Sequence, residues 1–374
     1  MRALRNVMAV IAGLAAMALV APAGAAPGTA PHPGDDQFTL PAPTGRQWVG
    51  SDALHLVDAD RPDPWVPTGP RELMVSVWYP AAVPGGHRVP YATAEESALV
   101  LAGIPVPADA LTRVRIHARV GVPPLRTPHR LPLVVLSPGF GLPRWTLTAL
   151  AEDLASRGYV VAGVDHTYEA AAVTFPDGRV AECVVCTGEV NGPEIAASRT
   201  LDLSFVLDRL LGHRRYGQLI DPRRIAAAGH SIGGAAAAAT MLADRRVDAG
   251  INLDGSFQPA LQTGLSRPFL MLGAGARHGL PGQDASWDAT WPHLTGWRRW
   301  LHAPEMEHSS VTDIAVWGDW VGLPVQPLPG ARCVEIIRSY VAAFVDRHPR
   351  HQPEPLLNGP SPQFPEIDFM GPTV

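Results

Sequence analysis

The hexapeptide GHSIGG, residues 229–234, places a serine among glycines in a pattern typical of a catalytic nucleophile. It fits G-x-S-x-G with Gly229, Ser231 and Gly233. In this pattern the serine lies on a sharp turn between a strand and a helix, where side chains two positions away would collide. An apolar run precedes the motif and an alanine run follows it, as the pattern requires. The sequence therefore predicts Ser231 as an acyl-transfer nucleophile; the alternative is a small-residue turn without chemistry.

A serine nucleophile needs a histidine base, which in chains with this turn lies downstream of both the serine and the acid. The downstream histidines are His278, His293, His302 and His308. We predict His308 in HSSVTD as the base, because it lies in the loop expected after the last strand. His302 falls in or beside that strand. His230 adjoins Ser231, should point away from it, and is interpreted as a packing residue.

Two aspartates compete for the acid that orients the base. Asp254 ends the predicted strand GINLDG, which neighbours the nucleophile strand. Asp284 lies in the loop after the following strand, PFLMLGAGA, a position that many enzymes of this kind use. The pattern alone favours Asp254 only narrowly, so both stay open at this point.

Two backbone N–H groups are predicted to stabilise an oxyanion. The N–H of Ile232 lies at the start of the predicted helix, where the helix dipole favours negative charge. The second donor should come from the loop LSPGFG, in which Gly139 permits close backbone approach and Phe140 supplies the N–H. His166, at the end of the strand YVVAGVDH, is interpreted as a loop histidine bonded to the backbone.

Alternating elements between these motifs predict an α/β fold with a mostly parallel central sheet and helices on both faces. Expected strands lie at 72–80, 131–137, 159–166, 224–230, 250–254, 268–276 and 297–303, and expected helices at 146–157, 198–215, from 232, and 331–348. Functional groups should gather at the carboxyl ends of such strands. Residues 46–350 form the expected catalytic domain. Within it, residues 91–128 interrupt the alternation as a lid, a pocket wall or a packing insertion.

The two ends of the chain differ in composition from this domain. Residues 1–26 are predicted to be a secretory signal, with Arg2 and Arg5 before an apolar stretch and small residues at the cleavage position. Residues 27–45 are expected to be a flexible lead-in, and residues 351–374 an irregular proline-rich tail. The prediction is a secreted, extracellular protein.

Composition excludes several function classes. The chain has 374 residues, a net charge of -5 and no lysine, so all 30 basic residues are arginines. A nucleotide-binding P-loop and Schiff-base chemistry both need a lysine. The net charge gives no reason to expect nucleic-acid binding. Neither a cofactor nor a metal ion is expected for this chemistry.

The three cysteines are Cys183, Cys186 and Cys333. In an oxidising compartment, a local bridge between Cys183 and Cys186 is the preferred pairing. A redox CxxC motif and half of a zinc site are alternatives. Zinc is disfavoured, because no second cysteine or histidine pair is apparent.

Four stretches together resemble the platelet-activating factor acetylhydrolase family, of the secreted α/β-hydrolase type. They are LPLVVLSPGFGLPRWTLTALAEDLASRGYVVAGVDH, GHSIGG, NLDGSFQP and HSSVTD, and the likeness spans roughly residues 71–345. The resemblance implies the α/β-hydrolase fold and metal-independent hydrolysis of short or oxidised acyl esters, including those of phospholipids.

The resemblance also implies residue roles. It implies Ser231, Asp254 and His308 as the triad, and so selects Asp254 over Asp284. It further implies Phe140 and Ile232 as the oxyanion donors. The chain departs from the family at Pro138-Gly139, where relatives often have His-Gly.

The sequence thus predicts a serine ester hydrolase whose partner is a small-molecule or lipid ester, with transient contact to a lipid surface. Alternatives on the same fold are a polyester or cutin hydrolase, a longer-chain lipase and a serine peptidase. A binding protein without catalysis is a further alternative. The acyl-chain preference and oligomeric state stay open.

Overall fold

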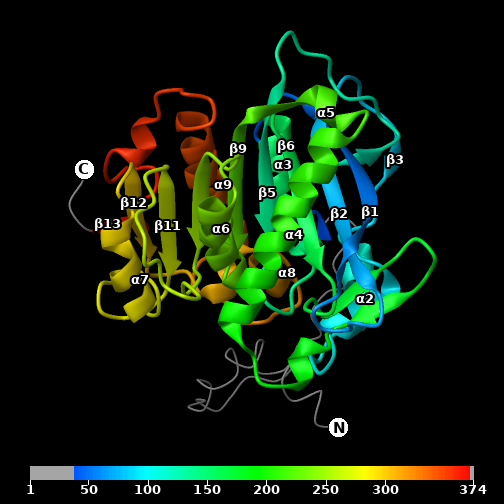
Figure 1. Ribbon diagram of the computed structural model, residues 1–374. Helices are drawn as coiled ribbons and strands as arrows, with labels where there is room; N and C mark the ends of the chain where they lie inside the picture. The colour runs from blue at the N-terminus through cyan, green and yellow to red at the C-terminus, as the bar shows by residue number, and fades with distance from the viewer. Residues whose placement is uncertain (1–37, 371–374) are drawn as a thin grey trace, which may run out of the picture.

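A twisted sheet of eleven strands forms the centre of the protein, with helices on both of its faces (Figure 1). The computed structural model describes residues 38–370, so the predicted signal 1–26 and residues 27–37 of the lead-in lie outside the described part. In the described part the strand order is β13-β12-β11-β10-β9-β5-β6-β2-β1-β4-β3.

Six neighbouring strands run parallel, and Ser231 directly follows one of them. They are β5 (Leu131–Ser137), β6 (Val160–His166), β9 (Ile220–His230), β10 (Ala249–Leu253), β11 (Phe269–Ala274) and β12 (Arg298–Ala303). All seven residues of β5 are buried. Parallel strands covered on both faces are apolar along their whole length, which is why these runs were recognisable from the sequence. The predicted α/β-hydrolase fold is confirmed.

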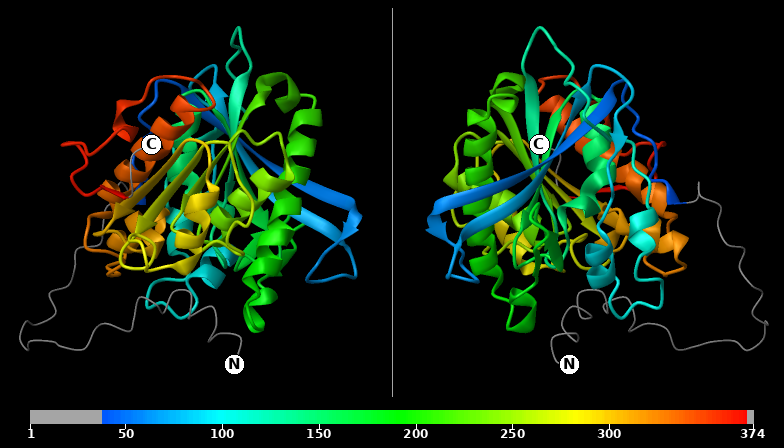
Figure 2. Two further views of the ribbon diagram at one scale, coloured as in Figure 1. Left: turned by 60° about the vertical axis from the view of Figure 1, so that its left-hand side comes forward. Right: turned by 90° about the vertical axis from the view of Figure 1, so that its right-hand side faces the viewer.

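Each face of the sheet has its own apolar core. Helices α3 (Thr148–Ser156), α8 (Ile314–Trp320) and α9 (Gly330–Arg347) cover one face, and α4 (Gly192–Gly212) and α6 (Ile232–Ala243) cover the other (Figures 1 and 2). Along β5, Val134 belongs to the first core and the adjacent Val135 to the second. This alternation follows from the two-residue period of a strand. No helix within residues 38–370 is both long and apolar enough to span a bilayer.

Antiparallel strands extend the sheet beyond its parallel part. Strand β2 (Pro70–Ala81) pairs antiparallel with β6 and with the long β1 (Trp48–Pro62), and the β1–β2 ribbon projects at one side of the molecule (Figure 2). The sequence predicted β2 but not β1. Beyond Val49 to Ser51, intermediate and exposed positions dominate β1, so it lacks a continuous apolar signal. The short strands β4 (Arg119–Val120) and β3 (His87–Arg88) complete this edge.

The lead-in is fixed to the domain from residue 38 onward. Leu40 is buried, with 1% of its surface exposed. The Arg338 guanidinium of α9 donates hydrogen bonds to the carbonyls of Pro41 and Ala42, at 2.7 and 2.9 Å. The expectation of a flexible segment is therefore wrong for residues 38–45. A buried arginine supplies the donors that irregular backbone would otherwise take from water.

The proline-rich tail also packs onto the domain. Leu357, Phe364 and Ile367 are buried in the core shared with α9. Strand β13 (Asp368–Met370) then pairs antiparallel with β12 and closes that edge of the sheet. Residues 351–367 have mostly irregular secondary structure, and their scattered apolar residues anchor them, whereas residues 371–374 lie outside the described part. Periodicity could not reveal this, because those residues follow neither a helical nor a strand spacing.

Residues 91–128 pack against the domain through polar anchors. Helix α2 (Ala94–Val100) begins with a capping box between Thr93 and Glu96. The Tyr91 hydroxyl donates to the buried Asp313 carboxylate at 3.1 Å. These contacts give the segment a fixed place beside the core of α8 and α9.

The tail anchor leads to a stability prediction. Replacing Leu357 with alanine should lower the free energy of unfolding by about 2–5 kcal/mol, because the side chain is fully buried. The matched control is Leu201→Ala, since 54% of the surface of Leu201 is exposed, and its effect should stay within about 0.5 kcal/mol. Urea denaturation of both variants measures the difference. Equal effects would show that the tail does not contribute to stability.

Candidate active site

Ser231 occupies a strained turn between β9 and α6. Its backbone has φ 56° and ψ −127°, a conformation that residues other than glycine rarely adopt. A Cβ on Gly229 would lie 2.2 Å from the carbonyl carbon of Gly233. A Cβ on Gly233 would lie 2.0 Å from the carbonyl oxygen of Ser137. Both glycines are therefore required by close backbone approach, as the motif predicted.

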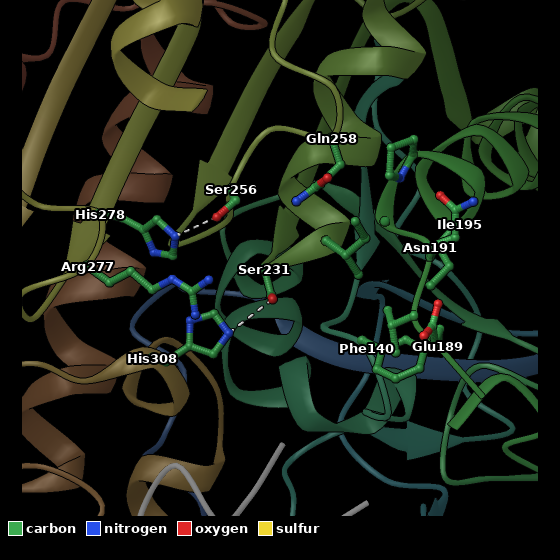
Figure 3. A pocket seen from close by; sticks show the side chains of 14 residues that line it. Phe140, Glu189, Asn191, Ile195, Ser231, Ser256, Gln258, Arg277, His278 and His308 are labelled. Carbon is green, nitrogen blue, oxygen red and sulfur yellow. Dashed lines mark hydrogen bonds between the residues drawn. The ribbon is translucent and has the colours of Figure 1, made fainter. Parts of the chain in front are cut away.

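A chain of hydrogen bonds links the three residues predicted as the triad. His308 Nε2 lies 3.0 Å from Ser231 Oγ (Figure 3), and His308 Nδ1 lies 2.5 Å from Asp254 Oδ2. Ser231 follows β9, Asp254 follows β10, and His308 begins a short 3-10 helix (His308–Val311) beyond β12. Parallel strands thus bring residues that are 54 and 77 positions apart in sequence to one edge of the sheet.

The Asp254 carboxylate is buried and charged. It lies at φ 54°, and its Oδ1 accepts a hydrogen bond from the Ala274 N–H at 2.6 Å. Burial alone would raise the pKa of Asp254, but interactions with His278 and His308 outweigh that effect and hold the pKa below its ordinary value. The carboxylate is therefore ionised at neutral pH, the state in which it accepts the His308 N–H.

Asp284, the competing acid, contacts a different histidine. Its Oδ2 accepts from the Ser256 hydroxyl at 2.5 Å and lies 3.1 Å from Nε2 of His278. It also caps helix α7 (Ala285–Thr290). The structure therefore brings Asp254, and not Asp284, to His308.

Two other histidines raised by the sequence have separate environments. The His302 Nε2 contacts the Gly275 carbonyl oxygen at 2.8 Å, away from the serine. His230 is buried, and its ring centroid lies 4.5 Å from that of His308. A Cβ on Gly139 would lie 2.7 Å from His230 Nδ1, so this glycine is also required by close packing. The packing interpretation of His230 agrees with these contacts.

Phe140 and Ile232 both line the cavity next to Ser231. Within residues 38–370 neither N–H donates a hydrogen bond. Ile232 is the first residue of the twelve-residue helix α6, whose N-terminus carries partial positive charge. The role of these two N–H groups as oxyanion donors stays a prediction.

A buried arginine supports the loop that contains Phe140. The Arg199 guanidinium of α4 donates to the Pro138 carbonyl oxygen and, at 2.7 Å, to the Glu169 carboxylate. Burial raises the pKa of Glu169, and the opposing charges of Arg199 and Arg71 act to lower it. The Pro138 carbonyl lies two residues before Phe140, so Arg199 fixes the direction of the loop backbone.

His166 belongs to the same buried network. Its Nε2 lies 2.9 Å from the Ser137 hydroxyl and its Nδ1 lies 2.8 Å from the Asp202 carboxylate. Burial, followed by the charge of Arg199, lowers the pKa of His166 to about 3, so the ring is neutral. The interpretation of His166 as a loop histidine bonded to the backbone is therefore wrong, because both nitrogens contact side chains.

A cavity of about 580 Å³ opens beside Ser231 (Figure 3). Residues 189–193 and Ile195 form one wall, and Ser256, Gln258, Arg277 and His278 lie on the other side. None of residues 91–128, all of them described, lines this cavity, so the expectation of a pocket wall there is wrong for this cavity. This wall was not predicted, because residues 189–191 lie in a loop without periodicity and Gly192, Pro193 and Ile195 belong to the first turn of α4.

The predicted local disulfide lies just before that wall. Cys183 and Cys186 are bonded, with 5.4 Å between their Cα atoms, and Cys333 is a buried free thiol. The Val184 and Val185 N–H groups both donate to the Tyr168 carbonyl oxygen. The bridge thereby fixes the start of the loop that continues into the cavity wall.

Comparisons with known proteins agree with this architecture. A sequence model described as platelet-activating factor acetylhydrolase, isoform II, matches residues 103–184. A probable 1-alkyl-2-acetylglycerophosphocholine esterase of Arthroderma benhamiae is 31% identical over 89% of this chain and 94% of its own length. A platelet-activating factor acetylhydrolase of Cavia porcellus is 30% identical over 35% of this chain and 36% of its own.

A solved structure extends the likeness. The ferulic acid esterase of Streptomyces cinnamoneus is 47% identical, with a TM-score of 0.82 over 90% of this chain and 100% of that chain. Fold, site and relatives define a carboxylic ester hydrolase of the α/β-hydrolase fold. Within that class, the chain belongs to the platelet-activating factor acetylhydrolase family.

The hydrogen bond from Arg199 to the Pro138 carbonyl oxygen predicts that a substitution at Arg199 slows the reaction at Ser231. Arg199→Lys keeps a positive charge near Glu169, but one ammonium group cannot replace the guanidinium fork that also reaches Pro138. We expect kcat to fall by about 10- to 100-fold with little change in KM, because the oxyanion donors are misplaced. The matched control is Arg209→Lys, an exposed position on the same helix. A change confined to KM would contradict this role.

Proposed function

We propose that the protein is a secreted serine esterase that hydrolyses short-chain carboxylic or phospholipid acyl esters through an acyl-enzyme on Ser231. The observation that carries the proposal is the unbroken hydrogen-bond chain from Ser231 through His308 to the ionised Asp254. Nucleophile, base and orienting acid stand in the order that a serine hydrolase requires. The chain ends at the cavity, where an ester carbonyl has access to the serine hydroxyl.

In the proposed first half-reaction, His308 Nε2 accepts the Ser231 proton as the hydroxyl oxygen attacks the ester carbonyl carbon. Asp254 holds the Nδ1–H tautomer and stabilises the imidazolium that forms. The Phe140 and Ile232 N–H groups stabilise the negative carbonyl oxygen. His308 then gives the proton to the leaving alkoxide, and the acyl group stays on Ser231.

In the second half-reaction, water attacks the acyl-enzyme. His308 takes a proton from the water, the tetrahedral intermediate forms in the same oxyanion site, and Ser231 leaves with the proton returned from His308. The products are the free acid and the regenerated enzyme. All proton transfers use one imidazole, so no other base is required.

The cavity favours small and polar esters. Its lining includes the charged and amide side chains of Glu189, Asn191, Gln258 and Arg277, which interrupt the apolar surface of Phe140, Val190, Ile195 and Ile232. A long acyl chain would need a continuous apolar surface to offset its transfer from water. This supports a short-chain acyl preference over the longer-chain lipase alternative.

A second candidate substrate class is the esters of hydroxycinnamic acids. The observation that favours it is the 47% identity to a structure described as a ferulic acid esterase. Such a substrate carries an aromatic acyl group and no phosphate, so it differs from an acetylated phospholipid in every contact outside the ester itself.

Secretion is the remaining part of the proposal. Residues 1–26 have the charged start, apolar stretch and small-residue end of a signal peptide. The Cys183–Cys186 disulfide fits an oxidising compartment.

An ester panel separates the candidates. We expect the mature protein to hydrolyse p-nitrophenyl acetate and butyrate faster than the palmitate, and Ser231→Ala to lose these activities. Short-chain phospholipid and methyl ferulate should then be compared by kcat/KM. Higher kcat/KM on methyl ferulate would select the second candidate, and rates rising with chain length would contradict the short-chain preference.

The two candidate acids give a matched pair of variants. Asp254→Asn should lower kcat by about 10,000-fold, because the amide cannot stabilise the imidazolium and favours the wrong tautomer. Asp284→Asn should have a much smaller effect, since Asp284 contacts His278 and Ser256 instead of His308. Steady-state kinetics on p-nitrophenyl acetate measures both. The reverse order would assign the acid to Asp284.

A further inference from the structure

The Asp254 carboxylate lies between two histidines, and only one of them is used in the proposed mechanism. Its Oδ2 bonds to His308, and its Oδ1 lies 3.0 Å from Nδ1 of His278. One ligand atom from each of the three residues lies within 4.8 Å of the other two. Two imidazoles and a carboxylate form a donor set that zinc prefers.

The second histidine has an unused nitrogen. His278 is 2% exposed, and its Nδ1 forms no hydrogen bond despite the short distance to Asp254, because the atoms are not aligned for one. A buried ring nitrogen that faces a carboxylate without a well-aligned hydrogen bond is costly and needs an explanation. A metal ion between Nδ1 and the carboxylate would satisfy both.

The surroundings of His278 fix its ring for this role. Its Nε2 lies 3.0 Å from the Ser256 hydroxyl, a contact drawn in Figure 3, and 3.1 Å from the Asp284 carboxylate. Trp287 stacks on the ring, with 5.6 Å between centroids. The Asp284 carboxylate at Nε2 keeps the ring proton on Nε2 and leaves Nδ1 free to bind a metal, as in many zinc sites.

We propose that Asp254, His278 and His308 form an inhibitory binding site for Zn²⁺. Zinc bonds to nitrogen and oxygen are about 2.0–2.2 Å long, so tetrahedral ligands lie about 3.3 Å apart. The distance from His278 Nδ1 to Asp254 Oδ1 is 3.0 Å and that from His308 Nδ1 to Asp254 Oδ2 is 2.5 Å, so both must widen, while the ligand atoms of the two histidines lie within 4.8 Å. The movement falls on His308, whose side chain is 45% exposed at the start of a short 3-10 helix. Water completes the coordination.

Zinc in this site blocks the base. Binding at Nδ1 of His308 moves its proton to Nε2, the nitrogen that would otherwise accept the Ser231 proton. The imidazole stays neutral, the number of protons is unchanged, and the bond to Asp254 is replaced by shared metal coordination. Inhibition therefore rests on the proposed function, whereas metal binding does not.

The binding test uses the inactive Ser231→Ala variant of the mature, tag-free protein. Ser231 is not a proposed ligand, so its replacement should leave the site intact. Calorimetry should then find one Zn²⁺ bound per chain. Ca²⁺ and Mg²⁺ should not compete, since they prefer oxygen ligands. Adding His278→Gln should weaken zinc binding by at least about tenfold, because a ligand is lost. The control substitution is His129→Asn, an exposed histidine outside the site, which should leave binding unchanged.

The inhibition test uses the active chain. Ester hydrolysis should fall over the same range of free Zn²⁺ in which calorimetry finds binding, and a chelator should restore it. Each variant is compared with its own zinc-free rate, and His278→Gln should need at least about tenfold more zinc for half inhibition. Absence of binding in Ser231→Ala, or equal binding with and without His278, would overturn the proposal. Binding without inhibition would place the metal elsewhere and also overturn it.

If His278→Gln does not fold, which circular dichroism would show, Co²⁺ provides a second measurement. Cobalt in a tetrahedral site with two histidines has characteristic visible absorption, and one equivalent of Zn²⁺ should displace it. An octahedral spectrum, as expected for adventitious surface binding, would contradict the site.

Discussion

The structure of the site depends on one hydrogen bond, between the buried Asp254 carboxylate and His308. It fixes the imidazole tautomer and joins the end of β10 to a loop that follows β12. The carboxylate stays ionised because its interactions with His278 and His308 outweigh the effect of burial on its pKa. An ionised group without such partners would be unstable in this environment. Asp254 has a left-handed backbone conformation, at φ 54°, and the surrounding structure offsets the energetic cost of this strain.

The sheet positions the other groups through close backbone packing. Gly229, Gly233 and Gly139 each lie where a Cβ would collide with backbone or with His230. The turn at Ser231 and the loop that contains Phe140 are thus held by contacts that tolerate little displacement. Beneath them, Arg199 fixes the loop through the Pro138 carbonyl. Preorganised donors of this kind contribute to rate because they need no rearrangement as charge develops.

The sequence predicted the parallel strands and the helices on both faces, because buried strands and amphipathic helices have strong periodic signals. It also named the three residues that the structure joins by hydrogen bonds, from motif order and family resemblance. It did not predict β1, the anchored tail or the cavity wall formed by residues 189–193 and Ile195. These parts depend on long-range contacts, such as Leu357 with the core of α9, that have no local pattern. The environment of His166 was missed for the same reason, since Asp202 is 36 residues away.

The proposed mechanism requires Ser231 to carry the acyl group during turnover. The most direct measurement is intact and peptide mass spectrometry after rapid acid quench of the protein with p-nitrophenyl acetate. We expect a single acetyl group on the peptide that contains Ser231, formed within the burst of p-nitrophenol release and absent in Ser231→Ala. Hydrolysis without any acylated serine peptide, or acetylation at another residue, would rule out an acyl-enzyme on Ser231.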